Sequence, residues 1–228
     1  MNNRIYLIGG GKGGVGKSLL SMAMIDLLTQ RGKQCLVIES DTSNPDVYRN
    51  YHECTHVELL DLDQVDGWIE LVNLCEKHSD KTVVINTGAR NSVGVGSFGA
   101  LLQNSLRELN RELVTLWVIN TQRDSLELLR DYREAMPQGV VHVVRNLHHG
   151  RESDFSLYEL SNTRQLVECM GGISLSMPRL AHRVATSIYN DRLPIEQAMK
   201  VLPLGNRVEL SRWRADAHKT LEAIYEKA

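Results

Sequence analysis

The sequence has few cysteines, and their spacing pairs none of them. Only four of the 228 residues are cysteines, Cys35, Cys54, Cys75 and Cys169, and no C-x-x-C occurs. This scatter argues against a disulfide framework and predicts a reduced chain in the cytoplasm. Residues 52–56, HECTH, hold three potential metal donors, but no second cluster completes a tetrahedral site. We therefore interpret that segment as a surface loop.

Long apolar runs, internal repeats and low-complexity tracts are also missing. No run approaches the roughly 20 apolar residues of a membrane span. The first predicted strand begins within a few residues of Met1, which leaves no room for a signal peptide. No linker is evident, so we expect residues 1–228 to form one domain, and the 42% hydrophobic content suits a globular core.

The chain lacks a strong net charge. The formal charge of −2 and the isoelectric point near 6.4 exclude a wholly basic nucleic-acid binder. A local basic patch remains open, because the last quarter of the chain concentrates positive residues. Among them are Arg179, Arg183, Arg192, Lys200, Arg207, Arg212 and Arg214. A solvated basic face is the alternative interpretation of the same residues.

Glycine, in contrast, is concentrated near the start of the chain. Residues 11–18 fit the phosphate-binding pattern G-x-x-x-x-G-K-[ST], in which glycines let backbone N–H groups turn toward phosphates. In this pattern the lysine reaches the β- and γ-phosphates of a nucleotide and the hydroxyl is a ligand of Mg²⁺. The eight positions are Gly11, Lys12, Gly13, Gly14, Val15, Gly16, Lys17 and Ser18.

The surroundings of this stretch favour a real phosphate loop over a chance glycine-rich turn. Residues 4–8 form a short, mostly apolar run that is typical of a buried parallel strand. The apolar content of residues 19–28 predicts a helix that runs to about Arg31, and Gly32 stands where a helix C-cap belongs.

Lys12 adds a second lysine to the loop, in the form K-G-G-V-G-K-S. This stretch resembles the deviant Walker A motif of the ParA/MinD superfamily of P-loop ATPases. The resemblance implies that ATP and Mg²⁺ are the cofactors and that Leu19 extends the nucleotide contact. It also implies that Lys12 reaches the phosphates of a partner subunit in an ATP-bound homodimer. A solvated loop lysine is the alternative.

Acidic residues follow the second predicted strand, residues 34–38. Glu39 and Asp41 then lie at the carboxyl end of a strand beside the phosphate loop, where Mg²⁺ and water are expected. The stretch resembles the switch I of the family, in which Asp41 matches the residue that orients the attacking water. Glu39 matches the first acidic position, where the family usually has Asp. Capping of a turn is the alternative for both residues.

The third predicted strand, residues 82–85, departs from the family pattern. The resemblance requires a Walker B Asp after it, whereas this chain has Asn86, which carries no charge to offset Mg²⁺. Either Mg²⁺ binding or hydrolysis is weakened, or Glu39 and Asp41 supply enough charge, and Asn86→Asp should raise Mg²⁺ affinity or rate. The glycine-containing residues 88–99 resemble a mobile switch II loop.

Further strands are predicted at residues 113–119, 140–144 and 172–176, with helices between them, one of which is expected at residues 155–169. Asn146, after the fifth strand, matches the family residue that reads adenine, and a turn Asn is the alternative. Pro178 and Arg179 resemble residues that line the base pocket. The alternation of strands and helices predicts an α/β fold with a doubly wound, mostly parallel sheet flanked by helices.

The family resemblance implies an ATP-dependent dimerisation switch with slow, partner-stimulated ATP hydrolysis. Length and loops resemble plasmid-encoded ParA-like proteins of the TraL and StbB kind, associated with conjugation or plasmid maintenance. A plasmid-encoded partner protein, and weak non-specific DNA binding with nucleoid association, are the partner predictions. An ATP-sensing scaffold that hydrolyses little ATP is the alternative, because Asn86 replaces the Walker B Asp.

Two rival families are disfavoured. The tail, residues 221–228, is mixed in charge and is no membrane-targeting amphipathic helix of the MinD kind. The paired cysteines of nitrogenase-type iron proteins are absent from the sequence.

Overall fold

The computed structural model describes residues 3–89 and 91–225, and its centre is a seven-stranded sheet with every pairing parallel. The strand order is β3-β2-β4-β1-β5-β6-β7, so the chain winds outward from β1 in both directions. The doubly wound α/β prediction is therefore confirmed. The strands are β1 (Arg4–Gly9), β2 (Cys35–Glu39), β3 (His56–Leu59), β4 (Thr82–Asn86), β5 (Glu112–Ile119), β6 (Val140–Asn146) and β7 (Ser174–Met177).

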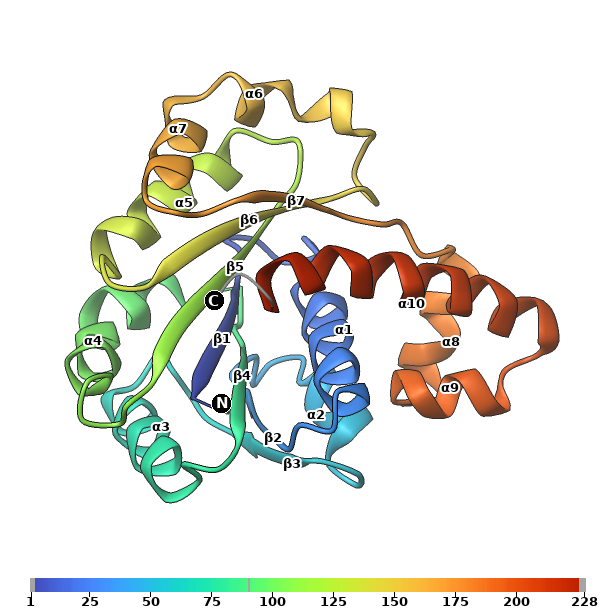
Figure 1. Ribbon diagram of the computed structural model, residues 1–228, viewed down its shortest axis with the longest axis horizontal. Coiled ribbons are helices and arrows are strands. Elements are labelled where there is room, and N and C mark those ends of the chain that lie inside the picture. The colour runs from blue at the N-terminus through green and yellow to red at the C-terminus, as the bar shows by residue number, and fades with distance from the viewer. Residues whose placement is uncertain (1–2, 90, 226–228) are drawn as a thin grey trace.

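Helices cover both faces of this sheet (Figure 1). They are α1 (Lys17–Gln30), α2 (Asp46–Tyr51), α3 (Val65–Lys77), α4 (Ser92–Ser105), α5 (Asp124–Ala135), the 3₁₀ helix η1 (Glu152–Phe155), α6 (Ser156–Glu159), α7 (Asn162–Cys169), α8 (His182–Asn190), α9 (Ile195–Val201) and α10 (Leu204–Tyr225).

Alternating residues of the strands divide the core into two layers. Tyr6 and Ile8 of β1 pack on the face that holds α1, α2, α8, α9 and α10. Ile5 and Leu7 pack on the opposite face, against residues of the helices from α3 to α7. Because successive side chains of a strand point to opposite faces, one apolar run serves both layers.

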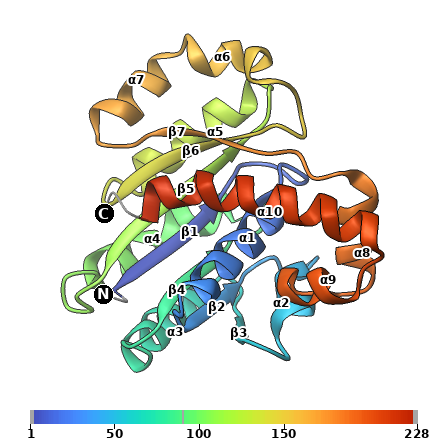
Figure 2. The same ribbon diagram turned by 45° about the vertical axis from the view of Figure 1, so that its right-hand side comes forward.

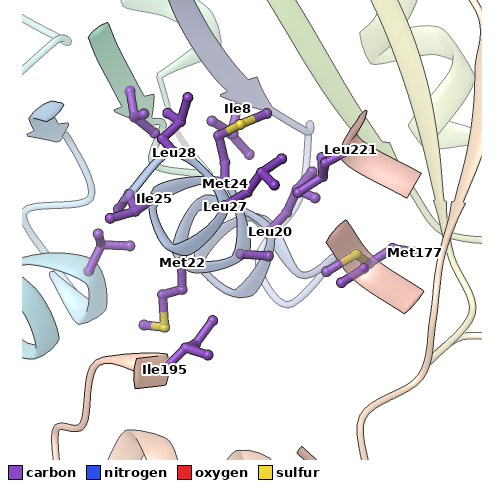
Figure 3. Packing of buried hydrophobic residues seen from close by; sticks show 14 of the residues in the cluster. Ile8, Leu20, Met22, Met24, Ile25, Leu27, Leu28, Met177, Ile195 and Leu221 are labelled. Atoms are coloured by element: carbon purple, nitrogen blue, oxygen red, sulfur yellow. The ribbon is translucent and has the colours of Figure 1, made fainter. Parts of the chain in front are cut away.

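Helix α1 lies inside the first layer and is buried on nearly all sides. Its apolar residues meet Ile8 of the sheet, Ile195 of α9 and Leu221 of α10 (Figure 3). A helix that is hydrophobic all round needs such enclosure. It ends at Gln30, and Gly32 follows with φ of 69°, close to the predicted end.

A buried ion pair fastens the last helix to α1. The Arg214 guanidinium of α10 donates two hydrogen bonds to Asp26, at 2.6 and 2.7 Å, and His218 Nε2 lies 2.7 Å from the same carboxylate. Figures 1 and 2 show α10 running beside α1. Arg214, which the sequence suggested for a basic surface patch, is thus committed to Asp26 within the fold.

Two local predictions are wrong. The helix expected at residues 155–169 is broken into η1, α6 and α7, because the Ser161 hydroxyl accepts a hydrogen bond from the Arg164 N–H and caps a new helix. Residues 92–99 belong to α4 and are not a loop. A Cβ on Gly94 would lie 1.8 Å from the Leu62 carbonyl oxygen, so this glycine permits close packing of the helix.

Candidate functional site

The phosphate loop joins the end of β1 to the start of α1, as predicted. Gly16 precedes the helix with φ of 105°, a left-handed conformation that favours glycine. The first turn of α1 contains no acidic residue, so the positive end of the helix is not neutralised there. Gly13 and Gly14 are exposed, Val15 is buried and Leu19 packs partly buried on the core. This end of the helix is suited to an anion.

Lys17 is buried at the base of the loop with only 6% of its surface exposed. Its ammonium donates a hydrogen bond to the Lys12 carbonyl oxygen at 3.0 Å, and no carboxylate of residues 3–89 and 91–225 lies within ion-pair distance of it. Burial lowers the pKa of Lys17, while the charges of Asp41 and Glu39 act in the opposite direction. A buried ammonium with spare donors fits an incoming phosphate.

The Lys12 side chain contacts two residues of its own chain. Its Nζ lies 2.5 Å from the Asp124 carboxylate, at the start of α5, and donates a hydrogen bond to Gln122 Oε1 at 3.1 Å. The hydrogen bond that the Asp124 carboxylate accepts from Lys12 lowers the pKa of Asp124. In the single chain Lys12 is therefore paired with Asp124 and Gln122 and is not a free solvated lysine.

Asn146, the last residue of β6, contacts the phosphate loop directly. Its Nδ2 donates to the Val15 carbonyl oxygen at 2.7 Å, and its Oδ1 accepts from the His148 N–H at 3.0 Å. A Cβ on Gly16 would lie 2.2 Å from Asn146 Nδ2, so the glycine leaves room for this contact. The amide fastens the loop to the sheet, a role that the sequence did not reveal.

Glu39, the last residue of β2, is fully buried, with 0% exposed. Its Oε1 accepts hydrogen bonds from the Asp41 N–H at 2.9 Å and from Asn86 Nδ2 at 2.8 Å. Its Oε2 accepts from the Val47 N–H at 3.0 Å. Burial raises the pKa of Glu39 to about 7, although the three donors oppose that rise.

Asn86 occupies the position opposite Glu39 in the register of β2 and β4. The side chain is 1% exposed, and its Oδ1 accepts a hydrogen bond from the Ser21 hydroxyl of α1 at 2.9 Å. Both ends of the amide are thus engaged within the protein. Ser21 was missed from the sequence; the available signal was a polar residue one turn after Ser18, within the otherwise apolar residues 19–25 of the helix.

Asp41 and Ser18 each have a side-chain oxygen that could still bind a metal ion. Asp41 Oδ1 accepts a hydrogen bond from the Asn44 N–H at 3.0 Å, which is the predicted turn-capping alternative. Within the described residues, the second Asp41 oxygen and the Ser18 hydroxyl have no hydrogen-bond partner. Mg²⁺ prefers oxygen ligands, so these two groups fit it, whereas the polar atoms of Glu39 and Asn86 are already occupied.

A second cross-link, missed from the sequence, ties the residue after Glu39 to the start of α4. Asn91 Oδ1 accepts hydrogen bonds from the Ser40 hydroxyl at 2.6 Å and from the Gly88 N–H. Asn91 Nδ2 donates to Asp63 Oδ1 at 3.1 Å. The two segments expected to sense the nucleotide are therefore in direct contact.

The base-side residues lie at the neighbouring strand end. Met177 of β7 pairs with Asn146 in register, so Pro178 and Arg179 follow directly beside Asn146. The Pro178 carbonyl oxygen accepts a hydrogen bond from Trp213 Nε1 at 2.9 Å. Burial lowers the pKa of His148, and the neighbouring His149 and the positive charge of Arg179 add to that effect.

An apolar cavity of about 320 Å³ lies behind the phosphate loop. Its walls come from residues 9–11 of the loop, residues 87–89, 91, 93, 95 and 96, and one side of α5. Leu128 of α5 occupies the space that a Cβ on Gly11 would enter, at 2.1 Å. Helix α5 thus supports the loop from behind.

Two other sequence predictions concern metals and membranes. In the described part of the chain, residues 52–56 included, no cluster of three or more His, Cys, Asp or Glu side chains could hold a metal ion. Among the helices formed by residues 3–89 and 91–225, none combines the length and apolar character needed to cross a membrane.

Comparison with known proteins places this geometry in a family. Residues 6–156 match the CobQ/CobB/MinD/ParA nucleotide-binding domain. Protein MobD of Acidithiobacillus ferrooxidans is 56% identical over 224 residues, which cover 98% of this chain and 99% of that protein.

Solved structures agree in fold at low sequence identity. The MinD cell division protein of Aquifex aeolicus is 15% identical with a TM-score of 0.58, covering 96% of this chain and 97% of its own. A nucleotide-binding protein of Archaeoglobus fulgidus, solved with ADP, is 12% identical with a TM-score of 0.51 over 89% and 92% of the two chains. On the family match, the extended identity and the shared fold, the chain belongs to the CobQ/CobB/MinD/ParA nucleotide-binding domain family.

Proposed function

We propose that this protein is a ParA-like ATPase in which ATP controls dimerisation, acting in plasmid maintenance or conjugative DNA transfer. The observation that carries the proposal is Lys17, a buried ammonium at a helix N-terminus with no carboxylate of the described residues in ion-pair distance. The extended identity to protein MobD supports the same role for both chains. We also propose that residues 1–228 act as one domain.

Each residue of the loop has a definite task in binding ATP. The backbone N–H groups of residues 11–17 and the Lys17 ammonium hold the phosphate oxygens. Asn146 keeps the loop in shape through Val15 and presents its remaining N–H to the adenine edge. Pro178 and Arg179 border the base from the neighbouring strand.

Ser18 and Asp41 would hold Mg²⁺, which supplies positive charge that neutralises the phosphates. Asp41 also accepts a hydrogen bond from the attacking water and orients it toward the γ-phosphate. Because Asn86 contributes no charge and its amide is engaged by Ser21 and Glu39, we expect slow intrinsic hydrolysis. A plasmid-encoded partner would accelerate it.

Dimerisation requires Lys12 to exchange one anion for another. In the single chain Lys12 is paired with Asp124, whose carboxylate is 53% exposed. Such a surface pair is weak, so a polyphosphate on a second subunit competes with it readily. Lys12 would then bridge the two subunits through the bound nucleotide, and loss of the γ-phosphate would release it.

DNA binding has less support than the sequence suggested. Arg214 is paired with Asp26, Lys200 with Glu196, and Arg212 with two carboxylates. The other basic residues of that patch are Arg179, Arg183, Arg192 and Arg207. We propose weak, sequence-independent and ATP-dependent binding through these residues, with an affinity that falls steeply as salt rises.

Phosphate release in the steady state tests the enzymatic proposal. We expect slow release by the wild type, and none by Lys17→Ala or Asp41→Ala, with Lys77→Ala on the exposed end of α3 as the control. Equal release by all four proteins would refute an ATPase site at this loop.

A non-hydrolysing ATP sensor is the second candidate, and the occupied Asn86 amide favours it. Tight ATP binding by the wild type, lost in Lys17→Ala, together with no phosphate release even with a partner, would select the sensor.

A further inference from the structure

We infer that Glu39 is a positioning residue, and that Asn86 donates the side-chain hydrogen bond that completes the set of donors around the Glu39 carboxylate. Together they couple the helix after the phosphate loop to segment 40–47, which joins β2 to the first turn of α2. Neither side chain is a direct ligand of Mg²⁺. The inference depends on the proposed function only for the importance of that segment in nucleotide binding.

The Glu39 carboxylate closes segment 40–47 at both ends. It accepts the N–H of Asp41, just after the strand, and the N–H of Val47, in the first turn of α2. The N-cap residue of α2, Pro45, makes no side-chain capping bond, so Glu39 satisfies one of the unpaired N–H groups of that helix. A carboxylate at a helix N-terminus is favourable.

Asn86 supplies the third donor from the adjacent strand. The two residues are register partners on β2 and β4, and the distance from Asn86 Nδ2 to Glu39 Oε1 is 2.8 Å. The carbonyl oxygen of the same amide accepts the Ser21 hydroxyl of α1. A continuous chain of hydrogen bonds thus runs from α1 through Asn86 and Glu39 to Asp41 and Val47.

This series of hydrogen bonds explains why residue 86 has an amide side chain. An Asp there would place a second carboxylate against Glu39 in a site where both side chains are at most 1% exposed. Two carboxylates at that distance cannot both be ionised, so one must bind a proton or move away. We therefore expect Asn86→Asp to disturb the metal-free protein, while its effect on Mg²⁺ affinity or hydrolysis rate stays a prediction.

A Gln at position 39 cannot replace the Glu. All three neighbours, the N–H groups of Asp41 and Val47 and the Asn86 amide, are donors, and a carboxylate offers only acceptors. A Gln would direct its own N–H₂ at one or more of these donors. The three donors are thus matched by a carboxylate, which can accept at both oxygens, and not by an amide.

Amide hydrogen exchange in segment 40–47 tests the inference on the full chain at pH 8, with EDTA and without nucleotide. We expect exchange to be roughly 10- to 100-fold faster in Glu39→Gln, because hydrogen bonds to a charged group are lost. Exchange in β1 and β6 should not change. Glu70→Gln, an exposed carboxylate on α3, is the matched control and should match the wild type.

If Glu39 is instead a metal ligand, Glu39→Gln leaves metal-free exchange unchanged and weakens only Mg²⁺-dependent nucleotide binding, and this result would overturn the inference. An equal rise in exchange over all strands would also overturn it, because it would indicate general destabilisation. Neither result depends on whether the protein hydrolyses ATP.

A double-mutant cycle provides the second test, should Glu39→Gln fail to fold. Asn86→Asp alone should speed exchange in segment 40–47, and the combination with Glu39→Asp, which shortens the opposing side chain, should recover at least part of the loss. Additive effects of the two substitutions would show that the residues are independent and would contradict the pairing.

Discussion

The phosphate loop and segment 40–47 lie at the same edge of the sheet but are built in different ways. In the loop, eight consecutive residues supply the glycines, the lysines and the start of the helix. Segment 40–47 is held by Glu39 at the end of β2 and by Asn86 and Asn91 at the junction of β4 and α4, more than 40 residues further along the chain. The first site is written locally in the sequence, whereas the second exists only after the strands have paired.

The largest effect should come from a substitution in the phosphate loop. Lys17→Ala removes the buried ammonium that faces the phosphates, so we expect ATP affinity to fall by about two orders of magnitude or more, as for loss of a charged hydrogen-bond partner in a buried site. Titration with a fluorescent ATP analogue measures it, with Lys77→Ala as the control. A change of less than threefold would show that the phosphates bind elsewhere.

Asn146→Ala should have the next largest effect on ATP binding, because it removes support that a distant part of the chain gives to the phosphate loop. Without the bond to the Val15 carbonyl, we expect ATP affinity to fall roughly 10-fold, the value of one good hydrogen bond at a buried site.

Inorganic tripolyphosphate separates the two roles of this amide. If Asn146 shapes the loop, Asn146→Ala weakens tripolyphosphate as well as ATP. If the residue only reads the base, tripolyphosphate binding is unchanged and the loop-shaping role is wrong.

The sequence specified the local site almost completely. The phosphate pattern, the preceding strand and the helix that follows all lie where the sequence predicted them, because each depends on neighbouring residues. The strand ends at Glu39 and Asn86 were also located correctly. Their pairing could not be predicted, because it requires the order of strands in the sheet, with β4 between β2 and β1.

The glycines after β4 led to a wrong prediction. They suggested a loop, because glycine weakens isolated helices. In the structure α4 contains three of them, and Gly94 approaches the backbone at Leu62 so closely that a side chain would not fit. Tertiary packing overrode local propensity, and only the fold reveals the reason for the glycine.

The pH dependence of the free energy of unfolding should report on Glu39, which holds segment 40–47. Burial holds the pKa of Glu39 near 7, above the value of 4.5 for a free Glu, so the folded protein retains a proton that the unfolded chain releases. This contribution is complete below pH 4.5 and disappears as pH rises through 7, on the order of 3 kcal/mol in the free energy of unfolding.

Urea unfolding of the metal-free protein between pH 4.5 and 8 measures this contribution. Glu39→Gln should remove that part of the slope, whatever its effect on absolute stability. An unchanged slope in the variant would assign the titration to another group.

The smallest effect should come from the exposed pair at the front of the loop. Asp124→Asn releases Lys12 without changing the shape of the side chain, and we expect ATP-dependent dimers to tighten by no more than a few-fold, since exposed ion pairs contribute little. Sedimentation equilibrium with ATP measures this change. Weaker dimers would mean that Asp124 itself takes part in the contact between subunits.

If ATP controls association through Lys12, sedimentation velocity should show it in three conditions: with Mg²⁺ and ATP, with Mg²⁺ and ADP, and without nucleotide. We expect the wild type to form dimers only with Mg²⁺ and ATP, and Lys12→Ala to stay monomeric under all three conditions although it still binds ATP. The same mass of the wild type in all three conditions, or Lys12→Ala dimers as stable as those of the wild type, would contradict it.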